Sequence, residues 1–510
     1  MTSTATITDK FKQSLIDYVY DDFQDSASSY YVGIGRAQPW DEPDSDAAPP
    51  FPTPSAYEAQ EFMDNMQSMK KAEDLSRIVE RYNYSTGGIY SGWNNDNHSF
   101  LVYNRAELGL DPCIGDYGFK HPFYVITASN KVYVCIKQGI GDNGLARVSS
   151  TQPSEVGEVG FRGFENPDNY QWRYLYTVGT ELTRKFLTSG YIPSQRILDS
   201  EDGGVTYNDL DLTGQEQALL QRQAVPGEII GVEIEAGGTG YPETTNTDLV
   251  SNYVELEFVA EPLIAEGVVQ TVTPARAWAR VIGGSIVDVT MKEPATDDFY
   301  HGMNYANASV KFVGSPAGSG AVLRPIVGPK KGIGYDVSID LNSTGLMFNV
   351  ILEGNEDGAY IVGNDFRQIG LIRNPMGIDS DGLGGIAYNQ FTDPRAIAMP
   401  ALTVDLTDPN LVPENITGDN PISQSTTGAS GILTAIANDT IYYTQNNQTG
   451  YTPFETGPLD IGAGGGATTV TAVTPSIIMK QGGEVYYIDN REPFIRNAEQ
   501  TEDIKLVMDF

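Results

Sequence analysis

The sequence contains little of what a covalent framework or a metal site requires. Of its 510 residues, 2 are cysteine and 3 are histidine. Cys113 and Cys135 are too few for a disulfide scaffold, and no C-x-x-C or H-x-x-x-H spacing occurs. We therefore expect no metal and no cofactor, and we interpret His98, His121 and His301 as three unrelated surface or core residues.

Basic residues and long apolar runs are also scarce. The chain has 32 Lys and Arg against 67 Asp and Glu, a net charge of −35, and no basic cluster stands out along it. Because affinity for nucleic acid comes mainly from Lys and Arg, we expect no nucleic-acid partner. Apolar stretches such as 396–404 fall far short of the ~20 residues that span a bilayer, so no membrane insertion is expected. The opening MTSTATITDKFKQ has no apolar core of a secretion signal, which favours folding in a reducing cytoplasm.

Glycine, proline and tyrosine are abundant, with 54, 29 and 29 residues. This turn-rich composition favours many short strands over long helices, and 40% apolar residues are enough for a globule. At roughly 150 residues per domain, the length allows about three domains. We predict a mainly β protein, a layered β-sandwich with a few short helices.

Two segments carry a helical pattern. Residues 8–23 space apolar side chains as an amphipathic helix does. Ser55 and Glu58 form a capping box, and the apolar spacing that follows predicts a helix over about 56–70. We interpret its stripe, which includes Met66 and Met69, as a face buried against a sheet; the alternative is an adaptable contact surface.

A period of two dominates from about residue 120 onward. Residues 121–138 predict two strands around an Ala-Ser-Asn turn, with Cys135 as a packed thiol. Residues 169–178 predict a strand with Trp172, Tyr174 and Tyr176 on one side.

Internal similarity marks an inserted module. GEIIGVEIEAGGTGY (227–241) resembles the segment 284–305, and 430–451 is a weaker echo. We therefore divide the chain into a sandwich body over 1–226, a Gly-rich β-repeat module over 227–335, and a return to the body over 336–510 with a less regular insertion at about 405–480. Residues 484–510 read as a strand, an Asp-Asn turn, a strand, and a last strand from about 502.

Motifs for catalysis are weak. DSDG (379–382) is interpreted as a turn because the twelfth position from Asp379 is Gln390, and GAGGGA (462–467) as a flexible loop. Ser68 and Lys71 match S-x-x-K by chance. An acidic, tyrosine-rich β protein is compatible with a carbohydrate-binding or glycoside-cleaving groove, or with a protein interface, and composition leaves the two equal.

Four ordered stretches resemble one protein family. VGIGRAQPWDEPDSDAAPPFPTPS (32–55) is similar to the amino-terminal signature of the gene-eight baseplate wedge proteins of T-even-type contractile-tailed bacteriophages, and GEVYYIDNREPFIRNAEQTEDIKLVMDF (483–510) to that family's ending. KVYVCIKQGIGDNG with YQWRYLYTV, and FRQIGLIRNPMG (366–377), fit in order between them. The residues that carry the resemblance most clearly are Gly35, Arg36, Pro39, Trp40, Pro49, Pro50, Pro52, Arg367, Asn374, Pro375, Asn490, Arg491 and Pro493.

The resemblance implies a non-enzymatic structural protein of the virion. It implies a homodimer that joins other wedge proteins in the tail baseplate after assembly in the host cytoplasm, with insertions that contact further tail or fibre proteins. Arg36, Trp40 and Arg491 then have two interpretations. They are interface anchors, or Trp40 covers the core while the two arginines pair with nearby acids.

Overall fold

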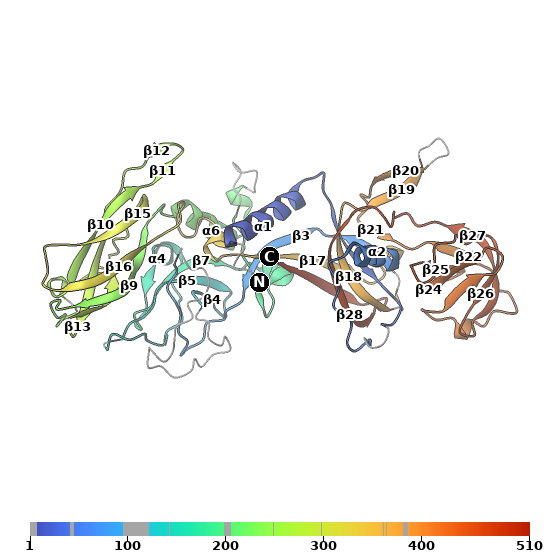
Figure 1. Ribbon diagram of the computed structural model, residues 1–510, viewed down its shortest axis with the longest axis horizontal. Helices are drawn as coiled ribbons and strands as arrows, with labels where there is room; N and C mark the ends of the chain where they lie inside the picture. Colours follow the sequence, from blue (N-terminus) through green and yellow to red (C-terminus); the bar gives the residue numbers. More distant parts are fainter. Residues whose placement is uncertain are drawn as a thin grey trace, which may run out of the picture. The chain divides into compact units, whose positions relative to one another are not determined.

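The computed structural model describes residues 8–40, 45–94, 122–141, 143–197, 206–247, 249–296, 298–360, 362–363, 365–380 and 386–510 (Figure 1). The protein is mainly β, with several sheets and a few short helices, as predicted. It divides into two compact units, which we describe separately: unit 1 comprises Met1–Gln13 and Ser76–Gly345, and unit 2 comprises Ser14–Leu75 and Leu346–Phe510.

Unit 2 is built around a five-stranded antiparallel sheet. Its strand order is β21 (Arg395–Ile397), β2 (Met66–Lys71), β1 (Tyr30–Gly35), β18 (Asp365–Arg373) and β28 (Glu484–Ile495). A second pair of strands, β17 (Gly345–Glu353) and β29 (Thr501–Asp509), shares an apolar core with one face of this sheet. The helix α1 (Asp9–Gln24), predicted over 8–23, adds Ile16 and Val19 to that core.

Helix α2 (Ala56–Asn65) covers the opposite face of the sheet. Strand β1 alternates as its sequence predicts, since Tyr30 faces the first core and Tyr31 faces α2. Gly33 and Gly370 lie opposite each other on β1 and β18, and a Cβ at either would come within 3.1 Å of the Phe62 ring. The two glycines thus allow α2 to approach the sheet closely, and unit 2 has the layers of a sandwich.

The predicted helix over 56–70 is shorter than expected. Ser55 caps it as predicted, accepting a hydrogen bond from the amide of Glu58 at 3.1 Å, but the helix ends at Asn65 and the chain continues as β2. Register shifts between β1 and β2 leave one extra residue in β2, so Met66 and Met69 both enter the core under α2. A bulge with apolar residues three apart imitates helical spacing, which is why the sequence pattern was misleading.

The insertion at about 405–480 is more regular than predicted, because residues 401–474 close a six-stranded barrel. The barrel runs through β22 (Ala401–Val404), β25 (Thr440–Thr444), β24 (Ala429–Ala437), β23 (Pro421–Gln424), β26 (Gly457–Ile461) and β27 (Gly466–Thr474), around its own apolar core. The glycine run 462–467, expected to be a flexible loop, forms the tight turn between β26 and β27 with residues 462–465, and its last two residues begin β27. Gly466 has a φ of 84°, and a Cβ there would lie 2.0 Å from the carbonyl oxygen of Asn410.

The segment 484–510 also differs from its prediction. β28 continues without a turn through Asp489 and Asn490, because β18 pairs with it on both sides of these residues. The last strand, β29, begins at Thr501 as expected. Asp379 and Ser380, the first two residues of the DSDG segment, are the last residues of strand β19 (Met376–Ser380). This strand pairs with β20 (Ile386–Gln390).

Unit 1 contains a four-stranded sheet rich in buried aromatic side chains. Its order is β4 (Tyr124–Ile126), β5 (Lys131–Lys137), β7 (Gln171–Thr177) and β6 (Phe164–Glu165), which confirms the strands predicted over 121–138 and 169–178. Trp172, Tyr174 and Tyr176 are all buried in its core. Sequence analysis missed the short helices α4 (Gly157–Arg162), α5 (Thr180–Phe186), α6 (Leu212–Gln223) and α7 (Val337–Asp340). In addition, β3 (Asp74–Glu80) pairs with β8 (Tyr191–Pro193).

The rest of unit 1 is the predicted repeat region. It holds a sheet of β14 (Ser285–Thr290), β13 (Arg276–Ile282), β10 (Val254–Pro262) and β15 (Tyr305–Phe312), the pair β9 (Ile229–Thr239) and β16 (Ser319–Val327), and the hairpin β11 (Ile264–Ala265) with β12 (Val268–Val269). Tyr241 and Tyr305, which end the two similar segments, enter the same core. The third echo, 430–451, belongs instead to the barrel, and its Tyr451 is exposed.

Single 3-10 turns lie at Tyr207–Asp209, Val250–Asn252, Glu356–Gly358 and Pro413–Asn415. Within the described ranges, no helix combines the length and the apolar character needed to cross a membrane.

Candidate interaction site

Three of the family-like stretches meet on the central sheet of unit 2. Gly35 on β1 lies opposite Gln368 on β18, and Gln368 lies opposite Asn490 on β28. The side chain of Gln368 donates to the Asn490 side-chain oxygen at 2.9 Å, and the Asn490 amide donates to the carbonyl of Pro50 at 3.0 Å. The proline-rich connector, β18 and β28 are therefore joined by residues of the motifs themselves.

Arg367 is the centre of this junction. Its side chain is 4% exposed, donates to both oxygens of Asp46 at 2.8 and 2.9 Å, and lies 2.9 Å from Asp365. It also donates to the carbonyl of Ala37. The hydrogen bonds from Arg367 hold the pKa of Asp46 below its usual range. The connector is thus tied to the sheet by a buried, multiply bonded guanidinium.

More carboxyl groups lie around Arg367 than its single positive charge can balance. Desolvation raises the pKa of Asp365, although Arg367 opposes this. Desolvation, together with the neighbouring Asp365, raises the pKa of Asp419, in the barrel, to about 6. One Asp419 oxygen is buried without a hydrogen-bond partner. This end of the sheet consequently has three carboxyl groups, two with raised pKa values.

Arg36 and Trp40 form a second contact of the motif. The Arg36 guanidinium lies 3.9 Å from the centre of the Trp40 ring and 3.1 Å from Glu61. The Trp40 indole donates to the carbonyl of Arg491 at 3.2 Å, and the Arg491 side chain lies 3.7 Å from Asp489. Both arginines thus lie beside acidic groups, as the structural interpretation expects, while half-buried Trp40 contacts Arg36 and a backbone carbonyl.

The outer side of this region is exposed and partly apolar. Phe51 in the connector is 96% exposed and Ile495 at the end of β28 is 57% exposed. Pro493 and Arg491 are exposed as well, whereas Pro49, Pro50 and Pro52 are half-buried and Pro39 is exposed. We call Phe51, Arg491, Pro493 and Ile495 the connector–β28 surface.

Asn374 and Pro375 do not belong to this junction. They follow the other end of β18, where the Asn374 side chain accepts hydrogen bonds from the amide of Ser29 at 2.8 Å and from Gln390 at 2.9 Å. Asn374 has a φ of 47°, a conformation that asparagine tolerates better than most residues, and Pro375 is buried. These two motif residues terminate the β18 strand.

Unit 1 contains a different polar group, which sequence analysis did not single out. Arg173 and Glu228, both almost fully buried, are joined by hydrogen bonds that include one of 3.0 Å, and they line a cavity of about 800 Å³ with His301. Burial opposes the charge of Glu228, but Arg173 keeps the pKa of this carboxyl below its usual range. Burial lowers the pKa of His301, whose Nδ1 lies 2.7 Å from the carbonyl oxygen of Ile229. No local signal reveals this group, because its members lie far apart in the sequence.

The cysteines, the histidines and the S-x-x-K match can be located only in part. Cys135 is a buried free thiol whose pKa is raised by desolvation, while Cys113, His98 and His121 lie outside the described residues. Ser68 and Lys71 lie on β2 and not on a helix. In the part of the chain that the structure describes, no three His, Cys, Asp or Glu side chains are arranged to hold a metal ion.

Many tyrosines are core residues in this fold. Of the tyrosines in unit 1, Tyr82, Tyr90, Tyr124, Tyr133, Tyr170, Tyr174, Tyr176, Tyr241 and Tyr305 are buried. Core packing therefore accounts for these tyrosines, which the sugar-groove alternative had counted in its favour.

No protein-family model matches the chain, and no curated protein sequence matches it significantly.

Proposed function

We propose that this chain is a structural protein of a virion, a baseplate wedge subunit of a contractile phage tail, and not an enzyme. The observation that carries the proposal is the junction in unit 2. Stretches around 32–55, 366–377 and 483–510 each resemble the wedge family, and their residues Arg367, Asn490 and Trp40 contact the other two stretches directly. Contacts between family-like motifs support a shared role for them in this sheet.

The connector–β28 surface supports the part of the proposal that concerns partners. β28 is the last strand of its sheet among the described strands, and an edge strand offers unpaired backbone groups to another chain. Pro493 lacks an N–H and lies beside a register shift, so a long ladder with a partner strand is disfavoured here. We propose that homodimerisation occurs at this surface mainly through side chains, with Phe51 and Ile495 as the apolar contacts.

The two modules fit the role of attachments on a common frame. The repeat region and the barrel each have a separate apolar core, so each can present loops without altering the central sheet. We propose that other wedge proteins bind the frame, while additional tail or fibre proteins contact these modules.

The proposal is tested with the full chain. Light scattering after size exclusion should give the mass of a dimer, co-expressed tail proteins should co-purify, and antibody labelling should place the chain at the tail tip of intact particles. A monomer that binds no tail protein and is absent from purified particles would refute it. Hydrolysis of a glycan, lost on changing a single Asp or Glu, would support the carbohydrate alternative instead.

A further inference from the structure

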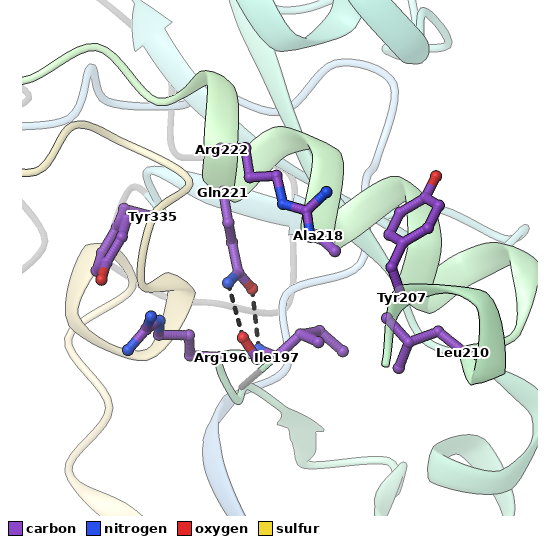
Figure 2. Close-up of a pocket in the computed structure, with 8 residues that line it drawn as sticks. All are labelled: Arg196, Ile197, Tyr207, Leu210, Ala218, Gln221, Arg222 and Tyr335. Carbon is purple, nitrogen blue, oxygen red and sulfur yellow. Dashed lines mark hydrogen bonds between the residues drawn. The ribbon is translucent and has the colours of Figure 1, made fainter. Parts of the chain in front are cut away.

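Two adjoining recesses on unit 1 are the starting point. The first, shown in Figure 2, is lined by Arg196, Ile197, Tyr207, Leu210, Ala218, Gln221, Arg222 and Tyr335. The second has a volume of about 380 Å³ and shares Gln221, Arg222 and Tyr335 with the first. Its further lining includes Lys330 and Lys331. The two recesses therefore form one continuous surface beside helix α6.

The charge of this surface is opposite to that of the chain. Four cationic side chains line it, Arg196, Arg222, Lys330 and Lys331, and no acidic residue is among the described residues that line either recess. Among the described residues, none places a carboxylate within 4.0 Å of Arg222, Lys330 or Lys331. In a chain with a net charge of −35, such a grouping is a local exception. It does not stand out in the sequence because the four cations come from three separate segments.

Aromatic rings lie against three of the four cations, and a hydrogen-bonded amide lies between them. The Arg196 guanidinium lies 4.5 Å and the Lys331 ammonium 4.4 Å from the centre of the Tyr335 ring, and Arg222 lies 5.2 Å from that of Tyr207. The Gln221 side-chain oxygen accepts a hydrogen bond from the Ile197 amide at 2.9 Å, and its side-chain nitrogen donates to the Ile197 carbonyl at 2.8 Å. Both hydrogen bonds are drawn as dashed lines in Figure 2. The recess is therefore partly pre-organised for an anionic group.

The wall of the second recess is apolar and protrudes. Leu263 and Ala265 line the recess and lead into the β11–β12 hairpin, where Ile264 is 62% exposed and Val268 and Val269 are each 61% exposed. Exposed aliphatic side chains in this number, next to a group of cations, are typical of a surface that another chain covers.

We infer that this surface binds an acidic polypeptide segment of a partner protein, one in which Asp or Glu alternates with aliphatic residues. The carboxylates contact Arg222, Lys330 and Lys331, and the aliphatic side chains cover Ile264, Val268 and Val269. A small anion uses only the cations and leaves the hairpin uncovered, so the combination favours a polypeptide. The inference does not depend on the wedge role, because it uses unit 1 residues outside the family-like motifs.

The test uses the full chain and a fluorescein-labelled synthetic peptide of alternating glutamate and valine. Fluorescence anisotropy should show saturable binding that weakens between about 0.05 M and about 0.5 M salt, because screening acts on exposed charges. The variant R222Q/K330Q/K331Q should weaken binding by at least about tenfold. The variant I264S/V268S should weaken it too, while leaving the salt dependence in place.

Matched controls separate this site from general electrostatics. R162Q/K311Q neutralises exposed cations elsewhere on unit 1, whose side chains are 75% and 62% exposed, and should bind as the unchanged protein does. Circular dichroism and thermal melting establish that each variant is folded. Equal binding by the triple variant and the unchanged protein overturns the inference. Displacement of the peptide by citrate at equal carboxylate concentration also overturns it, since the site then recognises small anions.

Discussion

A single buried arginine connects the polyproline segment to the central sheet of unit 2. Arg367 is nearly inaccessible to solvent and shares its donors among Asp46, Asp365 and a backbone carbonyl. Burying an ion pair is costly, but removing one partner from such a pair costs more than the pair contributes. The residue is therefore a sensitive position for the whole junction.

Replacing Arg367 by Met should destabilise unit 2 by about 3–5 kcal/mol, because Asp365 and Asp46 lose their counter-charge. Arg367→Lys keeps the charge but not the planar fork, and it should fall between Met and the unchanged protein. Urea denaturation followed by tryptophan fluorescence measures both. A loss below about 0.5 kcal/mol for Arg367→Met, the range of an ordinary surface change, would contradict this account.

Asp419 should make stability depend on pH. Its pKa in the folded protein is about 6 against an ordinary value of 3.8, so the folded state binds the proton more tightly than the unfolded state. The destabilisation is complete above pH 6 and disappears as the pH falls towards 3.8.

Asp419→Asn should therefore stabilise the protein on the order of 1–2 kcal/mol at neutral pH, with no gain near pH 4. Asn tolerates the φ of 73° at this position, so the substitution adds no backbone strain to the comparison. Thermal unfolding over this pH range measures the difference. A gain that is the same at both ends of the range would exclude titration of this carboxyl as its cause.

Trp40 separates the two interpretations of the motif. Trp40→Ala removes the ring over Arg36 and the indole hydrogen bond, which should lower stability by about 1–2 kcal/mol. If Trp40 also anchors an interface, incorporation into the wedge should fall well beyond that loss. Trp40→Phe keeps a ring and is the control. Normal assembly of the surviving folded Trp40→Ala protein would favour the core interpretation alone.

At the scale of elements, periodicity predicted strands well and their ends poorly. The strands over 121–138 and 169–178 were visible because β-branched or aromatic residues recur there at every second position, although both faces of these strands are buried. The end of α2 was not, because a bulge in β2 repeats apolar residues at helical spacing. The barrel was missed because its glycine turns carry no pattern of their own.

The candidate sites also differ in how far the sequence predicted them. Trp40, Arg367 and Asn490 were identified from short motifs, although their mutual contacts were not. The cationic recess was invisible, since Arg222 and Lys330 come together only when α6 and the segment after β16 are folded. Contacts between distant segments depend on topology, which one sequence does not display.

The edge strand β28 gives a prediction of its own. F51S/I495K changes two highly exposed side chains on the connector–β28 surface and should convert a dimer into a monomer without a large loss of stability. V259S/V313S changes two apolar side chains of unit 1 that are 55% and 40% exposed; it is the control and should stay dimeric. A dimer that survives F51S/I495K would place the interface elsewhere.

At the scale of the molecule, the barrel should behave as an independent domain. It closes on itself and has a separate core that includes Leu402, Ile422, Leu433 and Ile441. A fragment covering 398–476 should unfold cooperatively in urea, with a transition of its own. A fragment with no transition would show that the frame is needed for the barrel to fold.

Unit 2 is assembled from two segments between which all of residues 76–345 lie. During synthesis, β1 and β2 therefore leave the ribosome before unit 1 exists, while their neighbours β18 and β28 are translated after it. At roughly 5–20 residues per second, the segment of β1, α2 and β2 waits for tens of seconds before the strands that complete its sheet are made. The architecture thus creates a period in which the newborn chain is prone to aggregation.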